Sequence, residues 1–240
     1  MSNQYEQTQD FLKSDVYRQE LAAQRTFMAG VYGWMTIGLL VTAVIALGLD
    51  MAHLNKAMLK SSGILIAVII AQLVVGLGFR FILSKINAVV AGGLFMVYSA
   101  LLGVTFSLLF LAYTSASIYG VFFITAGMFG VMSAWGYVTK KDLSGMGSFL
   151  LMALIGLIIA SIVNMFMWSS MLNLLISYAG VLIFVGLTAY DTQKFKQLYA
   201  QGGVGTDENK RVAILGAFEL YLDFVNMFIY LLRILGSRRD

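Results

Sequence analysis

Five polar residues near the C-terminus recur with the period of an α-helix inside a segment that is otherwise apolar. Successive members are separated by 4, 3, 4 and 3 residues, which places all of them on one face of a helix. They are Glu219, Asp223, Asn226, Tyr230 and Arg233. The other faces of this segment carry Leu, Val, Phe, Ile and Met. A polar stripe this regular predicts a helix face that lines a protein interior or a watery cavity and does not face lipid.

Asp223 is the member of the stripe most able to do chemistry, because it lies 11 residues into an apolar run that begins at Val212. That position is about 17 Å deep at about 1.5 Å per residue, near the middle of a bilayer. A carboxylate there needs a partner or a proton. Asp191, at the end of the preceding apolar run, is the candidate partner. If the two meet, they share a proton and titrate as a coupled pair, which is a pH switch. Deprotonated, they are hard oxygen ligands of the kind that bind Ca²⁺.

Several of these residues also have simpler interpretations. Asp191 can be an ordinary carboxylate at a helix end, beside Lys194. Glu219 and Arg233 can be interfacial residues whose charged ends reach the two membrane surfaces. Arg80, at the end of the second apolar run, is the nearest candidate cation for the charged pair, but it is equally a candidate membrane anchor. The sequence leaves these alternatives open.

The composition indicates what must position these residues. Of the 240 residues 60% are hydrophobic and 12% are charged, whereas soluble domains average about 45–50% apolar and about 25% charged residues. Apolar runs of about 20 residues recur, each long enough to cross a bilayer as a helix, and they do not alternate as barrel strands do. We therefore predict an all-α integral membrane protein, a bundle of seven transmembrane helices. The predicted spans are 27–49, 61–83, 88–112, 118–138, 147–168, 172–190 and 212–235.

The chain divides into a polar N-terminal tail, residues 1–24, and a seven-helix transmembrane domain, residues 25–240. No signal-peptide pattern precedes the first apolar run, so this run is predicted to be a retained helix. Assigning Lys and Arg to alternate sides of the membrane gives 11 on the side of the N-terminus and 5 on the other. The positive-inside rule then predicts a cytoplasmic N-terminus. The side of the C-terminus stays open, because its arginines fall on the side with fewer basic residues.

Most connections between the runs are short, which predicts antiparallel neighbours in one bundle. The longest, 191–211, is predicted to be a loop with a flexible turn at its glycines, since it lacks the pattern of a phosphate-binding loop. Small residues at Ala126, Gly130 and Ala134 form a row that predicts close helix packing on that face.

Several classes of site are excluded. Without cysteine the chain can form neither disulfides nor thiolate metal sites, and its single histidine, His53, lies between the first two apolar runs, away from any partner for a zinc site or a Ser-His triad. No long basic run predicts nucleic-acid binding. No nucleotide, haem or redox site is visible, so we predict no cofactor.

Several stretches resemble the transmembrane Bax inhibitor motif family, the Bax inhibitor-one/YccA-type membrane proteins. The strongest match is the segment FELYLDFVNMF at 218–228, continuing to LLRILG at 231–236. Together with this segment, the supporting matches touch six of the seven spans. They are Tyr190-Asp191, the segment KKDLS at 140–144, the region of Gly103, and Arg25-Thr26-Phe27 leading to Val31-Tyr32.

The resemblance implies a bundle whose last helix is central and enclosed by the other six. It also implies a pH-sensitive calcium leak in a bacterial inner membrane, with Asp191 and Asp223 as pH sensor and ion ligands and Arg80 as a latch. An alternative function is implied as well, because bacterial members look like regulators of a membrane-bound ATP-dependent protease. In that case the tail would engage the protease or a translocon.

An enzymatic function is not predicted. Intramembrane aspartyl proteases also place one aspartate on each of two helices, but they require Gly-x-Gly-Asp where this chain has Leu220-Tyr221-Leu222-Asp223. They further require a Pro-Ala-Leu element, which a chain without proline lacks.

Overall fold

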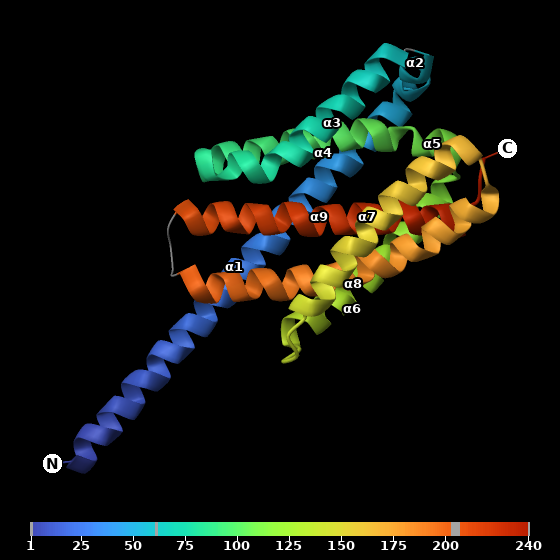
Figure 1. The fold of residues 1–240 in the computed structure, drawn as a ribbon. Helices are drawn as coiled ribbons and strands as arrows, with labels where there is room; N and C mark the ends of the chain where they lie inside the picture. Colours follow the sequence, from blue (N-terminus) through green and yellow to red (C-terminus); the bar gives the residue numbers. More distant parts are fainter. Residues whose placement is uncertain (1, 61, 203–206, 240) are drawn as a thin grey trace.

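The computed structural model describes residues 2–60, 62–202 and 207–239, and nearly all of them are helical (Figure 1). The helices are α1 (Ser2–Met51), α2 (Leu54–Lys60), α3 (Ser62–Ile82), α4 (Ala88–Ser107), α5 (Leu109–Ala112), α6 (Ser115–Val138), α7 (Ser144–Met167), α8 (Ser170–Gly202) and α9 (Asp207–Leu235). A 3-10 turn, Leu83–Lys85, joins α3 to α4. Seven segments of the described chain are long and apolar enough to span a membrane, α4 and α5 forming one of them. The predicted all-α membrane fold is thus confirmed.

The sixth span is longer than its apolar run. It does not end at Tyr190, because α8 continues to Gly202. The helix persists there because its next two turns keep a buried face, on which Phe195 is 0% and Tyr199 is 7% exposed. The predicted loop over 191–211 is therefore wrong for most of its length, and the glycine turn, after Gly202, lies outside the described residues.

The last helix occupies the centre of the bundle. It packs against α8, α1, α6 and α4. Of its most apolar stretch 67% is buried inside the protein, against 6% for α3 and 11% for α7. A helix that is apolar on nearly all faces belongs in an interior, and the predicted central position of the last helix is confirmed.

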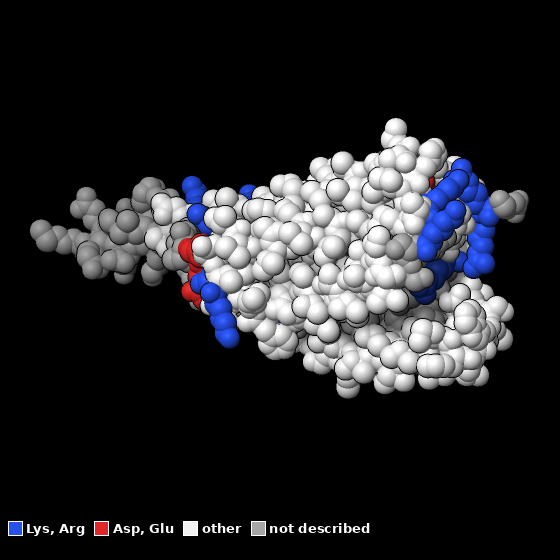
Figure 2. Space-filling model, turned by 90° about the horizontal axis from the view of Figure 1, so that it is seen from above, with Lys and Arg blue, Asp and Glu red and all other residues white. Residues whose placement is uncertain are grey.

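The outer helices present apolar side chains to the surroundings. Figure 2 shows Lys and Arg gathered at the two ends of the molecule, with a band of uncharged residues between them. This distribution is typical of a protein that crosses a bilayer, whose hydrocarbon layer excludes charge.

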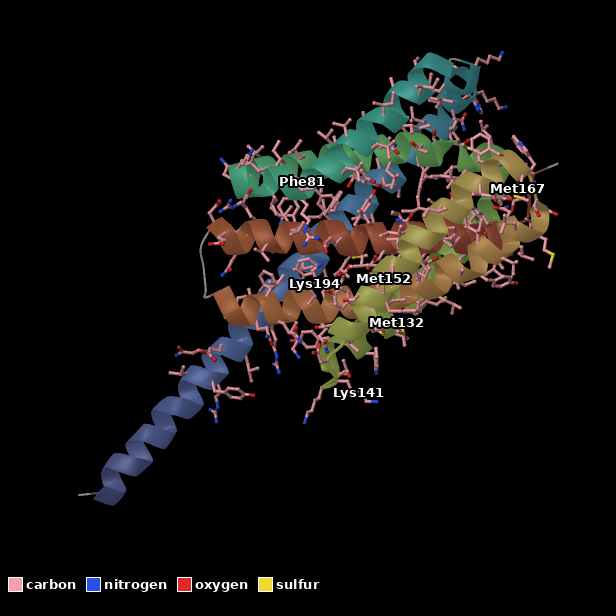
Figure 3. The ribbon with its side chains drawn as sticks, viewed as in Figure 1. Phe81, Met132, Lys141, Met152, Met167 and Lys194 are labelled. Atoms are coloured by element: carbon pink, nitrogen blue, oxygen red, sulfur yellow. The ribbon has the colours of Figure 1, made fainter. Side chains whose placement is uncertain are left out.

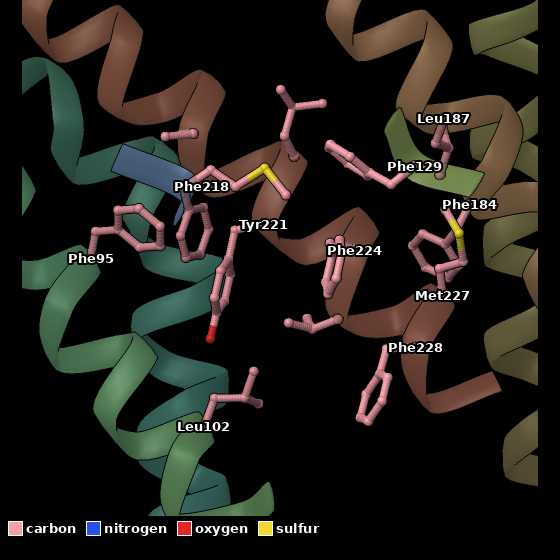
Figure 4. Packing of buried hydrophobic residues seen from close by; sticks show 14 of the residues in the cluster. Phe95, Leu102, Phe129, Phe184, Leu187, Phe218, Tyr221, Phe224, Met227 and Phe228 are labelled. Atoms are coloured by element: carbon pink, nitrogen blue, oxygen red, sulfur yellow. The ribbon is translucent and has the colours of Figure 1, made fainter. Parts of the chain in front are cut away.

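The side of α9 that faces α3 and α4 is packed with aromatic rings. Phe218 stacks on Phe79 with ring centroids 4.3 Å apart and meets the edge of Tyr98 at 5.0 Å. Tyr221 meets Phe95 at 5.3 Å in a T-shaped contact. Figure 4 shows Phe95, Phe218 and Tyr221 beside other rings of α9, Phe224 and Phe228. The five residues Phe79, Phe95, Tyr98, Phe218 and Tyr221 form what we call the aromatic cluster.

The close packing predicted for the small-residue row on α6 is wrong. A Cβ atom added at Gly130 would meet nothing within 4 Å, and Gly130 and Ala134 line an open groove between α6 and α1. The close approach uses Gly136 instead, where an added Cβ would lie 2.2 Å from the carbonyl oxygen of Ala189 in α8. Spacing alone identifies a row of small residues but does not say which face meets a neighbour.

The start of α9 is fixed to the connection between α3 and α4. The Arg211 guanidinium donates to three carbonyl oxygens of that connection at 3.3 Å each, and the Asp207 carboxylate accepts from the Ala88 amide at 3.3 Å. The three carbonyls are those of Leu83, Ser84 and Ile86.

Hydrogen bonds also fix the polar half of α8 to the connection between α6 and α7. The Gln193 side chain accepts from the Leu143 amide at 2.9 Å and donates to the Lys141 carbonyl at 2.8 Å. Lys196 donates to the Tyr137 carbonyl at the end of α6, at 2.7 Å.

Candidate functional site

The two predicted aspartates lie on neighbouring helices that pack against each other, α8 and α9. Asp191 is 8% exposed and Asp223 is 4% exposed. Neither lies at a helix end. Asp191 is followed by 11 more residues of α8, and Asp223 is 16 residues from the start of α9, about 24 Å at 1.5 Å per residue. The simpler interpretation of Asp191, as a helix-end carboxylate, is therefore wrong.

Lys194 joins the two helices. Its ammonium group lies 3.2 Å from Asp191 Oδ1, one turn earlier on α8, and also donates to the carboxylate of Glu219 on α9. Figure 3 places Lys194 between these two helices. The ammonium further lies 4.7 Å from the centre of the Phe195 ring, a cation–π contact. Lys194 is thus the partly buried counter-ion of this region.

Asp223 lies deeper and lacks such a partner. Its Oδ2 atom is buried and has no hydrogen-bond partner among the described residues. The charged groups that act on it electrostatically are the carboxylates of Asp191 and Glu219 and the ammonium of Lys194. We call these four residues the carboxylate cluster. A buried carboxylate oxygen without a partner is costly, and the Asp223 Oδ2 atom is one of three buried side-chain polar atoms without a hydrogen-bond partner in the described interior.

Arg80, the predicted latch, reaches the cluster from outside. Its guanidinium lies 3.9 Å from Glu219 Oε1, and its side chain is 70% exposed. Glu219 therefore contacts a cation on each side, Lys194 from α8 and Arg80 from α3. Its side chain is 17% exposed, which does not fit an interfacial residue that reaches the membrane surface.

The remaining members of the polar stripe do not join the cluster. Asn226 donates to the Leu222 carbonyl of its own helix at 2.8 Å. Tyr230 stacks on Phe184 of α8 with centroids 6.0 Å apart, and Arg233 lies 5.4 Å from the Tyr230 ring. Arg233 is exposed near the end of α9, which fits its interpretation as an interfacial residue.

The cluster does not have the form of a resident calcium site. Ca²⁺ takes six to eight oxygen ligands, and no group of three or more His, Asp or Glu side chains in the described part of the chain is arranged to hold a metal ion. The Lys194 ammonium already stands between two of the three carboxylates.

A chain of hydroxyl groups borders the cluster on the other side of α8. Tyr32 of α1 bonds to Ser133 of α6, and Ser133 lies 3.0 Å from the hydroxyl of Thr192, the residue after Asp191. Ser133 and Thr192 are buried. These bonds fix the rotation of α8 about its axis and so the direction in which Asp191 points.

A second set of hydroxyl hydrogen bonds lies on the far side of α9. The hydroxyls of Tyr221 and Thr42 lie 2.6 Å apart, and Thr42 also donates to the Ser99 carbonyl at 2.9 Å. All three residues are buried. This bond ties α9 to α1 and α4, so the central helix is held firmly on the side away from the carboxylates.

Reasoning from the sequence did not identify Lys194 as part of the site. The signal was present, because Asp191 and Lys194 are three residues apart and therefore neighbours on a helix. It was missed because the sixth span was predicted to end at Tyr190, which placed Lys194 in a loop.

Comparison with known proteins gives the family. Residues 24–240 match the family described as inhibitor of apoptosis-promoting Bax1. The inner membrane protein YbhL of Escherichia coli K12 is 48% identical over 231 residues, which cover 95% of this chain and 99% of that protein. An uncharacterized protein of Borreliella burgdorferi is 46% identical over 224 residues, 93% of this chain and 97% of its own length. An uncharacterized membrane protein of Streptococcus pyogenes is 33% identical over 229 residues, 92% and 96% of the two chains.

These matches cover the segments in which the sequence resembles Bax inhibitor proteins, and they extend over all seven spans. The chain therefore belongs to the Bax inhibitor family of multi-pass membrane proteins.

Proposed function

We propose that this protein is a pH-sensitive cation leak, with calcium as a permeant ion, gated by protonation of Asp191 and Asp223. The observation that carries the proposal is the buried Asp223 carboxylate, which has an oxygen without a hydrogen-bond partner among the described residues and lies at the centre of α9. Intramembrane carboxylates of this kind typically mark ion or proton pathways.

The charge balance of the cluster supports the proposal. Three carboxylates face one partly buried ammonium, and Arg80 adds a second positive charge at the exposed edge. With every group ionised, one negative charge is left without a counter-charge. Either a proton or a cation from solution can supply the missing charge, so the two compete for the same oxygen atoms. This competition is the physical basis of a pH-sensitive cation path.

Arg80 and Lys194 have different parts in this proposal. Lys194 holds Asp191 and Glu219 together across the helix boundary, and its ion pair with Asp191 is lost when that carboxyl is protonated. Arg80 is the latch that holds Glu219 from α3. In this proposal, protonation of Asp191 removes one of the two carboxylates that hold Lys194 and so changes the link that Lys194 makes from α8 to Glu219 on α9.

We also propose that the N-terminus is cytoplasmic and that the protein lies in the bacterial inner membrane. The excess of Lys and Arg on the N-terminal side supports this orientation. The name of the Escherichia coli relative, an inner membrane protein, supports the location.

The test is calcium flux into proteoliposomes that contain an indicator dye. The pH is stepped from about 8 to about 5.5, a range that brackets the titration of a perturbed carboxyl. The variants are Asp191→Asn and Asp223→Asn. Asp142→Asn is the matched control, because Asp142 is an exposed carboxylate in the connection between α6 and α7. The parent and the control should respond to pH, and either cluster variant should lose that response.

Absence of flux in the parent, or an unchanged pH response in both cluster variants, would refute the leak. The alternative function would then take its place, namely modulation of a membrane-bound protease or translocon through residues 1–24. One observation favours that alternative, since the N-terminal end of α1 projects away from the bundle (Figure 1). Deletion of residues 2–24 should abolish such modulation and should leave an ion leak through the bundle intact.

A further inference from the structure

A second region of the molecule has the features of a ligand site and plays no part in the proposed leak. It is an apolar hollow of about 270 Å³ bordered by α1, α4, α5, α6 and α9. An engineered apolar protein cavity of roughly 150 Å³ stays dry and binds benzene. The hollow is therefore large enough for part of an apolar chain and offers water nothing to bond.

The hollow opens where lipid would lie. Tyr119 and Phe123 of α6 are among its lining residues, and they are 48% and 72% exposed. Its inner wall is formed by α9 through Phe224, Val225 and Phe228, which are buried. An acyl chain of the bilayer can therefore enter from the side and reach the central helix without crossing a polar layer.

A polar hollow of about 350 Å³ adjoins the apolar one at the end of the bundle where the C-terminus lies. It is lined by Asp50, His53, Lys56, Leu111 and Arg239. Residues of the same helices line both hollows. Leu47 of the apolar hollow is about one turn of α1 from Asp50 of the polar hollow, and Phe110 of the apolar hollow precedes Leu111 of the polar hollow in α5.

Arg239 connects the two hollows directly. Its guanidinium donates to the carbonyl oxygen of Phe110, a residue that lines the apolar hollow, at 2.9 Å. A guanidinium has five N–H donors, so further donors remain for an anion. Lys56 is exposed, and its ammonium has no ion pair or hydrogen bond among the described residues.

The charge of the polar hollow favours an anion. Its acidic member, Asp50, accepts a hydrogen bond from Asn55 at 2.7 Å. Lys60 and Arg238 are close in the sequence to Lys56 and Arg239, and they add to the positive charge at this end of the bundle. Figure 2 shows Lys and Arg gathered there. A basic hollow directly above an apolar one has the two-part chemistry of a phospholipid, with phosphate at the membrane surface and an acyl chain below it.

We propose that this pair of hollows binds one anionic phospholipid, with the headgroup phosphate at Lys56 and Arg239 and one acyl chain in the hollow beside α9. The proposal is independent of the leak, because it uses neither the carboxylate cluster nor its gate. The lipid would belong to the leaflet on the C-terminal side, whichever side of the membrane that is.

The test is retention of lipid by the purified full-length protein, measured by native mass spectrometry after exchange with phosphatidylglycerol or phosphatidylcholine. The parent should retain one phosphatidylglycerol per chain in preference to phosphatidylcholine. The double variant Lys56→Gln, Arg239→Gln should lose about tenfold in affinity for phosphatidylglycerol and should no longer prefer it.

The second arm of the lipid-retention test fills the apolar hollow with a larger side chain. Ala43→Phe places a ring in the hollow and should abolish retention of both lipids. The matched control is Ala67→Phe, because Ala67 is exposed on α3, far from the hollow. If Ala43→Phe does not purify as a folded protein, Ala43→Leu tests the same point with a smaller side chain.

Three results would overturn the proposal. They are equal retention of the two lipids by the parent, equal loss of lipid in the control and in the filled variant, and competition by soluble glycerol phosphate at the affinity of the whole lipid. The last result would mean that the apolar hollow contributes nothing to binding.

Discussion

The two sides of α9 differ in how completely their buried groups are satisfied. Towards α3 and α4, Phe218 and Tyr221 make close ring contacts, and the Tyr221 hydroxyl is hydrogen-bonded. Towards α8, Asp223 has a buried oxygen without a partner among the described residues, and Lys194 is shared between two carboxylates. One side of the helix is therefore closely packed and hydrogen-bonded, while the other carries the charged groups of the proposed gate.

The largest effect on stability should come from the satisfied side. Phe218→Ala removes a ring that contacts Phe79, Phe95 and Tyr98. We expect it to lower the free energy of unfolding by about 3 kcal/mol, the low end for Phe→Ala, because transfer from water contributes little inside a bilayer. Unfolding of the parent and the variant in mixed detergent micelles measures this change in the free energy of unfolding. If the variant lost its pH response while its stability was unchanged, the division between the two sides would be wrong.

Lys194→Met should have the next largest effect. It removes the cation between Asp191 and Glu219, so Asp191 loses its ion pair and Glu219 keeps only Arg80. We expect this to cost about 2 kcal/mol, below the range for a fully buried pair, because the lysine is partly exposed. Adding Asp191→Asn should restore part of the loss, since it removes one of the unpaired charges. The same unfolding assay on the single and double variants measures this coupling. Strictly additive effects would show that Lys194 and Asp191 do not act together.

Tyr221→Phe should have a smaller effect. The variant loses the bond to Thr42 but keeps the ring contacts, and Thr42 still donates to the backbone. A single neutral hydrogen bond contributes about 1 kcal/mol. The flux assay should show the parental pH response, because this hydroxyl lies on the side away from the carboxylates. An altered response would mean that the two sides of α9 are coupled.

The smallest effect should come from a carboxylate outside the membrane. Asp142 accepts hydrogen bonds from the side chain and the backbone amide of Ser144, which hold its pKa below the ordinary value of 3.8. Because the folded-state pKa is lowered, this stabilisation is present above the ordinary value and is lost as the pH falls through the folded-state pKa. Thermal unfolding of the parent and of Asp142→Asn should differ slightly at about pH 7, and the difference should shrink as the pH is lowered through the folded-state pKa. A difference that persists below that pKa would assign the effect to something other than the charge.

Much of the fold could be predicted from hydropathy, since seven apolar runs need seven helices to cross a bilayer. The extent of α8 could not, because hydropathy falls at Asp191 and Lys194 although the helix continues. These charges are tolerated inside the bundle because they pair with each other and with Glu219, and that partner is 25 residues away from Lys194 in the sequence. A local reading of the chain cannot anticipate such long-range pairing.

The candidate site could also be predicted only in part, because part of it depends on contacts between residues far apart in the sequence. The depth of Asp223 follows from counting along an apolar run, and its neighbourhood with Asp191 follows from adjacent antiparallel helices. The unsatisfied state of Asp223, by contrast, depends on what the facing side chains offer, and that appears only when α8 and α9 are placed side by side.

The two sets of bonds at the ends of α8 and α9 have a mechanical consequence. Arg211 and Asp207 fasten α9 to α3 and α4, whereas Gln193 and Lys196 fasten α8 to α6 and α7. On this side of the molecule α9 is therefore bonded to one group of helices and α8 to another, and the two groups meet along a seam. Of the ion pairs among the described residues, the pair between Lys194 and Glu219 is the one that crosses it. In the proposed leak, losing this pair would change the force between two groups of helices and would not merely reorient one side chain.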